Sequence, residues 1–562
     1  MTTTSADPDT GPSRTETLDR RRAAPHAVLA AAAIALVSLV GPILFVVFAD
    51  GGVHASNDSF TYLGAADELA HGNGWTYPFG DVGAPVTLFP PLYPLLLAAP
   101  AALGIDPFEW VLWQNAAFLA LLAGSVGWIV HRETGGRVIG AIIASLLVQL
   151  GLPTVHAYAR IWSETLFFPL VVLTLASLTR HLVTRRLAPL VLAAALGGAA
   201  MLTRYAGIAL FVTACALLVA WPGRSVWARG RAVGLYVLVA SVPSALWVLR
   251  NSLASGTLTG DNELVHELTG TAVVNGLQRI VRWFLPDRPP GPINDVLVAV
   301  AIVSLALLVA ACAWIAIRSR AVRSMAPSPI VPACLAFVLV HFIFIVVANA
   351  FSTRAPPFNN RILGPIFAPL VIAVVVVGDA VWRGARPAIA PRVAIGTVAV
   401  SLLALSVLAS TETLPSIIGS PIGSAAEYRA FDRTLEPLVP PRARLFSTRP
   451  NVAWFLLRQP VSSLPRSCRG GRVLPNPSFP EELAALGRRL AEEPRAVIVF
   501  RRSRECAPFS VSLLKRELRL ARVGPPGRPG AVWVLSGPSD PSSFSFDDAR
   551  GLVHLRTSER HL

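Results

Sequence analysis

Long apolar segments recur along the chain up to about residue 410, and polar or Arg-rich stretches separate them. A helix needs ~20 apolar residues to cross the ~30 Å hydrocarbon core of a bilayer, and about eleven segments approach this length. The predicted spans are 27–49, 110–130, 138–157, 162–180, 187–202, 205–221, 232–249, 293–317, 328–350, 362–381 and 392–410. We therefore predict an α-helical polytopic membrane protein.

The connections between these segments alternate in charge. Alternate loops contain the Arg-rich sequences HRETGGR, TRHLVTRR, WPGRSVWARGR, RSRAVRS and WRGARPAIAPR. The other connections begin DGGVHASNDSF, RNSLASGTLTGDNE and FSTRAPPFNNR. Because basic loops stay on the cytoplasmic side, we predict a plasma-membrane protein with a cytoplasmic N-terminal tail over residues 1–25. An odd number of crossings then places the C-terminal region outside the cell.

The transmembrane domain should cover residues 26–410 and carry two long outer connections, 50–109 and 250–292. In the first, NDSFTYLGAADELAHG predicts an amphipathic helix, and FPPLYPLLLAAPAALG predicts a second apolar helix that starts after two prolines. If this second helix crossed the membrane, every later loop would move to the opposite side. Most of the Arg-rich loops would then lie outside the cell, which the tendency of basic loops to stay in the cytoplasm argues against.

The pattern changes after residue 410. Three short segments, RARLFST, RAVIVF and AVWVLSG, resemble strands, whereas PNVAWFLLRQ, PEELAALGRRLAEE and VSLLKREL resemble helices. We predict a small extracytoplasmic α/β domain over residues 411–535 and a polar, loosely ordered tail over 536–562. Cys468 and Cys506 both fall in this outer region, so a disulfide between them is chemically permitted.

Composition narrows the class of partner. The 562 residues are 53% hydrophobic and 15% charged, with a formal net charge of +16. In a soluble protein that charge would suggest nucleic acid, but here it lies mainly in the loops between spans, so we expect membrane lipid and no nucleic acid as partner. No CxxC or His-rich metal pattern occurs. No cofactor is therefore certain, and a divalent cation stays open.

Two acidic residues are candidates for chemistry. Asp58 follows the first span at the start of the predicted amphipathic helix and could act as a general base; alternatively, Asp58 or its neighbour Asn57 or Ser56 simply caps that helix. Glu164 opens the fourth span and is the second candidate, with an ion pair to Arg160 at the membrane surface as the alternative to a functional role.

Three arginines lie at predicted outer ends of spans, namely Arg204, Arg250 and Arg361. A charge against hydrocarbon is costly unless it is paired, snorkels to the interface or binds an anion. Because all three lie on the same side, they could bind an anion, with snorkelling as the alternative for each one.

Several motifs, in this order, resemble the membrane-embedded GT-C glycosyltransferases, which include the protein O-mannosyltransferases and the lipid A aminoarabinose transferases. They are NDSFTYLGAADELAHGNGW, PPLYPLLLA, RIWSETLFFPLVVL, LTRYAGIAL, ALWVLRNSLASGTLTG and NNRILGPIFAPL. The resemblance implies that Asp58 is the catalytic base or a metal ligand. It also implies that Glu164 faces the same cavity as Asp58, where it could position the acceptor or bind a cation. Relatives often carry two adjacent acidic residues here, whereas this chain has Asn57 before Asp58, which weakens the case for a metal.

We therefore predict an inverting glycosyltransferase that moves a sugar from a polyprenyl-phosphate donor to an acceptor, a protein or another cell-envelope component, on the outer face of the membrane. Arg204, Arg250 and Arg361 would bind the donor phosphate. The absence of a P-loop or GxGxxG motif agrees with a lipid-linked donor. The alternatives are a polytopic transporter or flippase for a lipid or solute, and an inactive relative that keeps the bundle as a scaffold.

Overall fold

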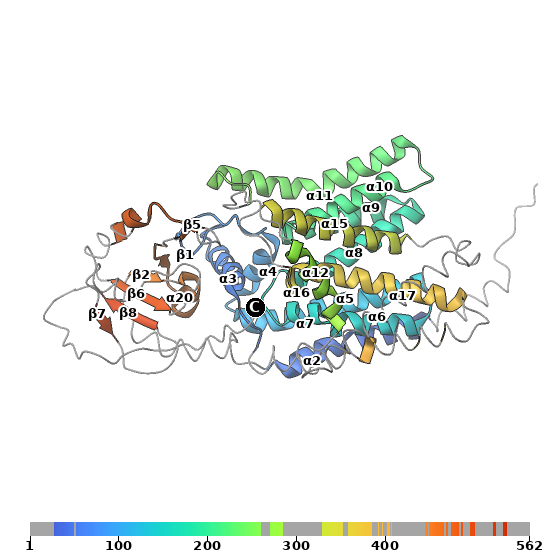
Figure 1. Ribbon diagram of the computed structural model, residues 1–562, viewed down its shortest axis with the longest axis horizontal. Helices are drawn as coiled ribbons and strands as arrows, with labels where there is room; N and C mark the ends of the chain where they lie inside the picture. The colour runs from blue at the N-terminus through green and yellow to red at the C-terminus, as the bar shows by residue number, and fades with distance from the viewer. Residues whose placement is uncertain are drawn as a thin grey trace, which may run out of the picture.

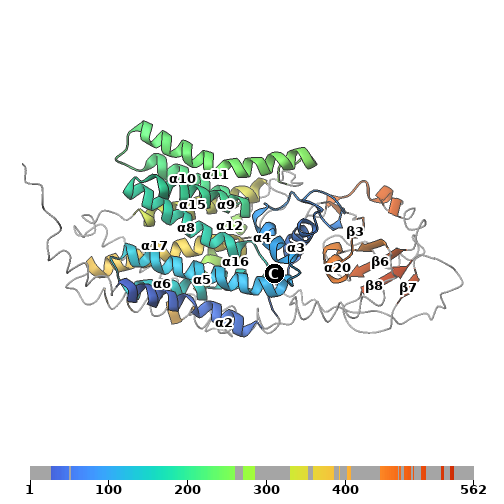
Figure 2. The same cartoon turned by 180° about the vertical axis from the view of Figure 1, so that it is seen from behind.

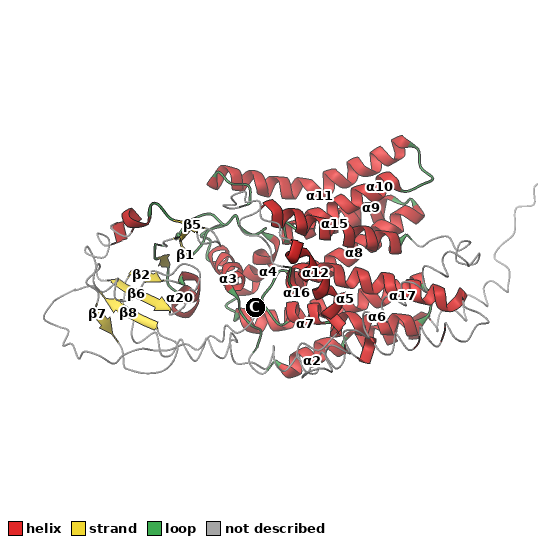
Figure 3. Ribbon diagram, in the orientation of Figure 1, coloured by secondary structure: helices red, strands yellow, loops and turns green. Residues whose placement is uncertain are grey.

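The computed structural model describes residues 27–49, 52–259, 270–284, 329–351 and 358–384, together with shorter stretches between 392 and 536. A bundle of helices forms one end of the molecule and a β-sheet the other (Figure 1). Helices α3 (Asn57–Ala70) and α4 (Leu92–Ala102) lie between the two parts in both views (Figures 1 and 2). Colouring by secondary structure separates the helical end from the strands (Figure 3).

Six helices in the described part of the chain are long and apolar enough to cross a membrane, so the chain is a multi-pass membrane protein. They are Ala27–Phe48 (which ends with α2, Val40–Phe48), α5 (Pro107–Glu133), α8 (Glu164–Thr184), α11 (Val226–Ser255), Ile330–Asn349 within α15 (Ile330–Phe351), and Asn360–Arg383, which comprises α16 (Asn360–Leu363), η2 (Gly364–Ile366) and most of α17 (Phe367–Gly384). Helices α6 (Val138–Leu150) and α7 (Leu152–Tyr158) would form a seventh span bent by 53°.

Two shorter apolar helices, α9 (Leu187–Thr203) and α10 (Gly207–Ala220), match two further predicted segments. The predicted span 293–317 lies outside the described residues, and 392–410 lies largely outside them. The count of eleven therefore stays a prediction. Helix α4 has 11 residues, so it is only about 16 Å long and too short to cross the hydrocarbon core. It begins after Pro91, as the sequence predicts.

Helix α8 is the central helix of the bundle. Of its most apolar stretch, 72% is buried, against 22% for α11. Helix α9 packs against both, and Gly198 allows its close approach to α11, because a Cβ at this position would lie 2.9 Å from the carbonyl oxygen of Ala240. The first residue of α8, Glu164, is therefore surrounded by other helices and does not lie on the outer surface of the bundle.

Within the described residues the sheet has six strands in the order β1-β3-β2-β6-β8-β7. Three were predicted from sequence, β2 (Arg444–Ser447), β6 (Arg495–Phe500) and β8 (Val532–Ser536), as was helix α20 (Pro450–Leu457). The others are β1 (Phe79–Gly80), β3 (Val461–Ser463) and β7 (Ala521–Val523), and a separate hairpin pairs β4 (Cys468–Arg469) with β5 (Leu474–Pro475). The edge strand β1 comes from the first long connection and pairs with β3 in parallel.

This pairing joins the sheet to the helical part, so the two are not independent modules. Aromatic contacts strengthen the junction: Phe455 of α20 lies 5.2 Å from Phe60 of α3 and 5.3 Å from Phe108 of α5, centroid to centroid. The predicted limits 411–535 stay a prediction. The tails 1–25 and 537–562 lie outside the described residues, as does Cys506, which leaves the predicted disulfide with Cys468 untested.

Candidate active site

Four charged side chains from four parts of the sequence meet at the end of the bundle that faces the sheet. Arg361 is the centre of the group: its Nη1 lies 2.5 Å from Asp58 Oδ2, and its Nε donates to Glu164 Oε1. Arg204 Nη1 lies 2.6 Å from the same Glu164 oxygen. We call these four residues the charge cluster. Its two carboxylates and two guanidinium groups are electrically balanced.

Asp58 is free to join the cluster because other residues cap its helix. Ser56 is the N-cap residue of α3, and its backbone N–H donates to Ser59 Oγ at 2.8 Å, completing a capping box. Asp58 is the second residue of the helix, two positions after Ser56, and 32% of its side chain is exposed. Of the three residues that could cap α3, Ser56 therefore has that role, and Asp58 is not the N-cap residue.

Glu164 is completely buried, and its two ion pairs are with Arg204 and Arg361. The alternative pairing with Arg160 is not formed. Instead, Arg160 Nη1 donates to the carbonyl oxygen of His156 at 3.0 Å, and its guanidinium group lies 4.8 Å from the centre of the Trp162 ring. A buried carboxylate is stable only with such close compensation, so Glu164 and the two arginines form one unit.

The two arginines of the cluster are held from outside it. Arg204 directly follows α9 in an extended conformation, and its Nη1 donates to Ser163 Oγ at 3.0 Å. Ser163 Oγ lies 3.0 Å from the hydroxyl of Tyr62, which is buried. Burial raises the pKa of Tyr62 above its usual range, so its hydroxyl stays neutral. Arg361 lies 4.4 Å from the centre of the Trp162 ring, a cation–π contact.

Arg250, the third predicted phosphate ligand, makes its hydrogen bonds elsewhere. Its Nη1 donates to the carbonyl oxygen of Val86 at 2.6 Å and its Nη2 to that of Trp75 at 2.9 Å, while the guanidinium group stacks on Trp247. Within the described residues none of its hydrogen bonds reaches the charge cluster. Arg250 thus fastens the first long connection to α11.

Sequence reasoning missed the parts of the site that carry no charge. Trp162 contacts Arg160 and Arg361 with its ring, and its Nε1 donates to Ser56 Oγ at 2.8 Å. Ser163 connects Tyr62 to Arg204. The signal was present in the motif RIWSETLFF, where an aromatic and a small polar residue stand between Arg160 and Glu164.

The described residues hold no group of three or more His, Cys, Asp or Glu side chains that could bind a metal ion. Asp58 and Glu164 are the two carboxylates of the cluster, and Arg361 bridges them. A divalent cation between them would have to displace that guanidinium group. These residues therefore do not fit a resident metal.

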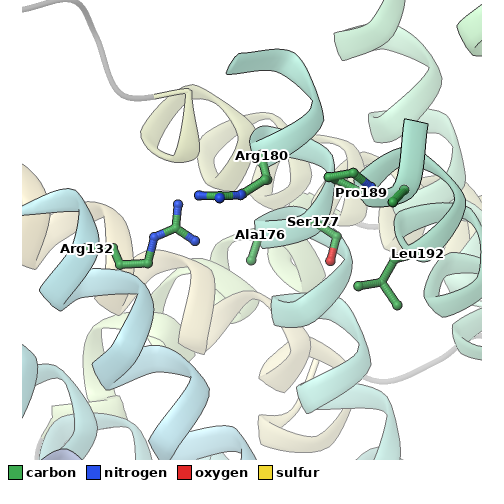
Figure 4. A pocket seen from close by; sticks show the side chains of 7 residues that line it. Arg132, Ala176, Ser177, Arg180, Pro189 and Leu192 are labelled. Atoms are coloured by element: carbon green, nitrogen blue, oxygen red, sulfur yellow. The ribbon is translucent and has the colours of Figure 1, made fainter. Parts of the chain in front are cut away.

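A cavity of about 320 Å³ lies at the other end of α8, and Figure 4 shows it from close by. Its lining comes from α5, α8 and α9 and consists of Arg132, Ala176, Ser177, Arg180, Ala188, Pro189 and Leu192. Arg180 follows Glu164 by 16 positions of a continuous helix, which corresponds to about 24 Å. The cavity is therefore separate from the charge cluster.

No protein-family profile and no curated protein matches the sequence. Among solved structures, ArnT from Cupriavidus metallidurans bound to undecaprenyl phosphate is similar over 90% of this chain and 98% of its own, with a TM-score of 0.59 and 15% identity. The chain has the fold of the GT-C glycosyltransferases. The apo state of ArnT gives the same TM-score and identity over 92% of this chain and 98% of its own.

The archaeal oligosaccharyltransferase AglB from Archaeoglobus fulgidus, in complex with an inhibitory peptide and a dolichol-phosphate, shares 13% identity, with a TM-score of 0.46 over 83% of this chain and 69% of its own. The GT-C resemblance that the sequence motifs suggested is thus confirmed as a resemblance of fold, on the strength of ArnT.

Proposed function

We propose that this GT-C-fold protein is an inverting glycosyltransferase that moves a sugar from a polyprenyl-phosphate donor to an acceptor at the extracytoplasmic face of the plasma membrane. The observation that carries the proposal is the charge cluster, in which a partly exposed carboxylate of α3, the helix between the bundle and the sheet, is held by an arginine of α16. The alternation of Arg-rich loops supports the orientation. The acceptor would be a protein or another component of the cell envelope.

Asp58 is suited to be the catalytic base. Arg361 binds its Oδ2, and no described residue donates a hydrogen bond to its Oδ1. In the reaction the acceptor oxygen forms a bond to the anomeric carbon while the bond from that carbon to the phosphate oxygen breaks. The proton of the acceptor hydroxyl passes to Asp58, and the bonding electrons leave with the phosphate. Attack from the side opposite the phosphate inverts the configuration.

Glu164 would act as a positioning residue rather than touch the acceptor, because its side chain is not exposed at all. Its charge fixes Arg204 and Arg361, and an arginine carries five N–H donors in a planar arrangement, more than the two carboxylates occupy. The remaining donors could bind the donor phosphate. Arg250 would contribute by holding the first long connection in place.

The test is transfer of radiolabelled sugar from a panel of polyprenyl-phosphate sugars into membrane acceptors. The intact protein should transfer label from one donor, and Asp58→Asn should abolish transfer at equal expression. Asp67→Asn is the matched control, because Asp67 lies on the same helix with 31% of its side chain exposed and outside the cluster. If the intact protein transfers nothing but moves lipid across the membrane, the flippase alternative replaces the proposal.

A further inference from the structure

The charge cluster is balanced, which raises the question of what attracts an anionic lipid to it. Asp58 and Glu164 neutralise Arg204 and Arg361. A neutral group of ion pairs gives little net attraction for a phosphate, although its arginines have more N–H donors than the carboxylates occupy. Additional positive charge beside the cluster is needed to bind a phosphate strongly.

Arg160 provides such a charge. No described carboxylate forms an ion pair with it, and its guanidinium group shares the Trp162 ring with Arg361. Burial and the nearby Arg361 charge lower the pKa of Arg160 to about 10, so it stays protonated at neutral pH. The side chain is mostly buried, and a buried cation without an anionic partner is costly. A bound anion would remove that cost.

The backbone around Arg160 is fixed by residues distant in sequence. The side-chain amide of Asn115 donates to the carbonyl oxygens of Arg160 at 3.0 Å and of Tyr158 at 2.7 Å. His54 pairs with the same segment, since its N–H donates to the carbonyl oxygen of Ala159 at 2.9 Å. The guanidinium group is therefore presented by a rigid support, which reduces the entropy lost on binding.

A second cation approaches from the second long connection. Helix α12 (Gly270–Val281) and the turn η1 (Arg282–Phe284) pack beside α16, and α12 and α16 lie next to each other in Figures 1 and 2. Trp283 Nε1 donates to Asn360 Oδ1 at 3.2 Å, beside Arg361. Turn η1 also packs against α7, which ends two residues before Arg160, so the end of α12 that carries Arg279 lies beside the segment that carries Arg160. Arg279 likewise has no ion-pair partner among the described residues.

We propose that Arg160 and Arg279, beside Trp162 and Arg361, bind the phosphate group of the polyprenyl lipid. This inference rests on the proposed function. The donor is a phosphodiester with one negative charge, whereas the product is a monoester with a charge of about −1.5 to −2 at pH 7. Two uncompensated cations match the charge of the product better than that of the donor. The two arginines therefore bind the leaving phosphate more strongly as its bond to the sugar breaks. Binding that is stronger in the transition state than in the ground state lowers the activation barrier.

The experiment measures binding of undecaprenyl phosphate to the purified full-length protein in nanodiscs. Arg160→Gln should weaken binding about 10- to 100-fold, the equivalent of one charge-assisted hydrogen bond, and Arg279→Gln should weaken it in the same direction. Arg160→Lys, which keeps the positive charge, should bind with intermediate affinity. It keeps the proposal testable if Arg160→Gln does not fold. Arg132→Gln, at the far end of α5, is the control and should bind normally.

Two ligand controls separate the lipid from its head group. Undecaprenol, which lacks the phosphate, should bind the intact protein and Arg160→Gln alike. Inorganic phosphate should compete only at concentrations far above that of the lipid; if it competes equally well, the site is one for free phosphate and the lipid assignment is wrong.

The proposal and the proposed function fail in different ways. If Arg160→Gln and Arg279→Gln bind undecaprenyl phosphate as tightly as the intact protein, or if Arg132→Gln is weakened as much as they are, the site is refuted while sugar transfer can still occur. If the intact protein transfers no sugar and binds no polyprenyl phosphate, the proposed function fails as well.

Discussion

Replacing Glu164 by Gln tests whether the charge cluster is one unit. The substitution keeps the shape of the side chain and removes its charge, so the cluster changes from neutral to a net charge of +1. Removing one partner of a buried ion pair costs ~3–5 kcal/mol. Because 16% of each arginine side chain, Arg204 and Arg361, is exposed to solvent, we expect a cost at the lower end of this range, ~3 kcal/mol. Asp58→Asn removes the same charge at a more exposed position, where ~0.5–1 kcal/mol is expected.

The free energy of unfolding can be measured by detergent denaturation followed through tryptophan fluorescence. We expect Glu164→Gln to lose both stability and sugar transfer, and Asp58→Asn to lose transfer with little loss of stability. Asp379→Asn is the control, because Asp379 also bridges two arginines, Arg137 at 3.1 Å and Arg383 at 2.9 Å, at the other end of the bundle. It should keep its transfer activity. Equal destabilisation by the Glu164 and Asp58 variants would refute the reasoning.

Three further predictions concern packing around the site. Trp162→Ala should lower transfer more than Trp162→Phe, because Phe keeps a ring for the cation–π contact worth ~0.5–2 kcal/mol, and equal losses would show that the ring does not matter. Phe455→Ala should loosen α20 from α3, at a cost of ~3–5 kcal/mol, seen as faster hydrogen exchange in α20 and unchanged exchange in α8. Gly198→Ala should destabilise the protein by ~1–3 kcal/mol, while Gly230→Ala, where a Cβ meets open space, should not; equal unfolding of the two would contradict the packing described.

The sequence predicted the helices where length and hydropathy suffice. The apolar run 138–157 was predicted as one span, whereas the chain bends by 53° between α6 and α7. At Gly151 a Cβ would collide with the ring of Phe367, so a tertiary contact that is invisible in the local pattern accompanies the break. Strand β1 was missed because two residues have no periodicity and are ordered only by their pairing with β3.

One rule applied to the sequence was enough to select the four residues of the charge cluster. Ionisable residues at the ends of apolar segments are costly unless they are paired, and Asp58, Glu164, Arg204 and Arg361 do meet in space. The same rule selected Arg250, whose partners are backbone carbonyl groups. A sequence does not reveal which carbonyl groups a fold leaves without partners, so the two kinds of arginine look alike until the chain is folded.

The edge strand β1 has a consequence for biosynthesis. Phe79 pairs with Val461, and about 380 residues separate them. At ~5–20 residues per second, synthesis of the intervening chain takes roughly 20–80 s, during which the first long connection has no partner strand. For that interval the newly inserted protein presents the aromatic surface of α3, with Phe60, uncovered to the solvent or to a chaperone. If translation stops before Val461, the membrane-inserted bundle therefore lacks the complete sheet. The exposed aromatic surface of α3 would then be the feature that quality-control factors recognise.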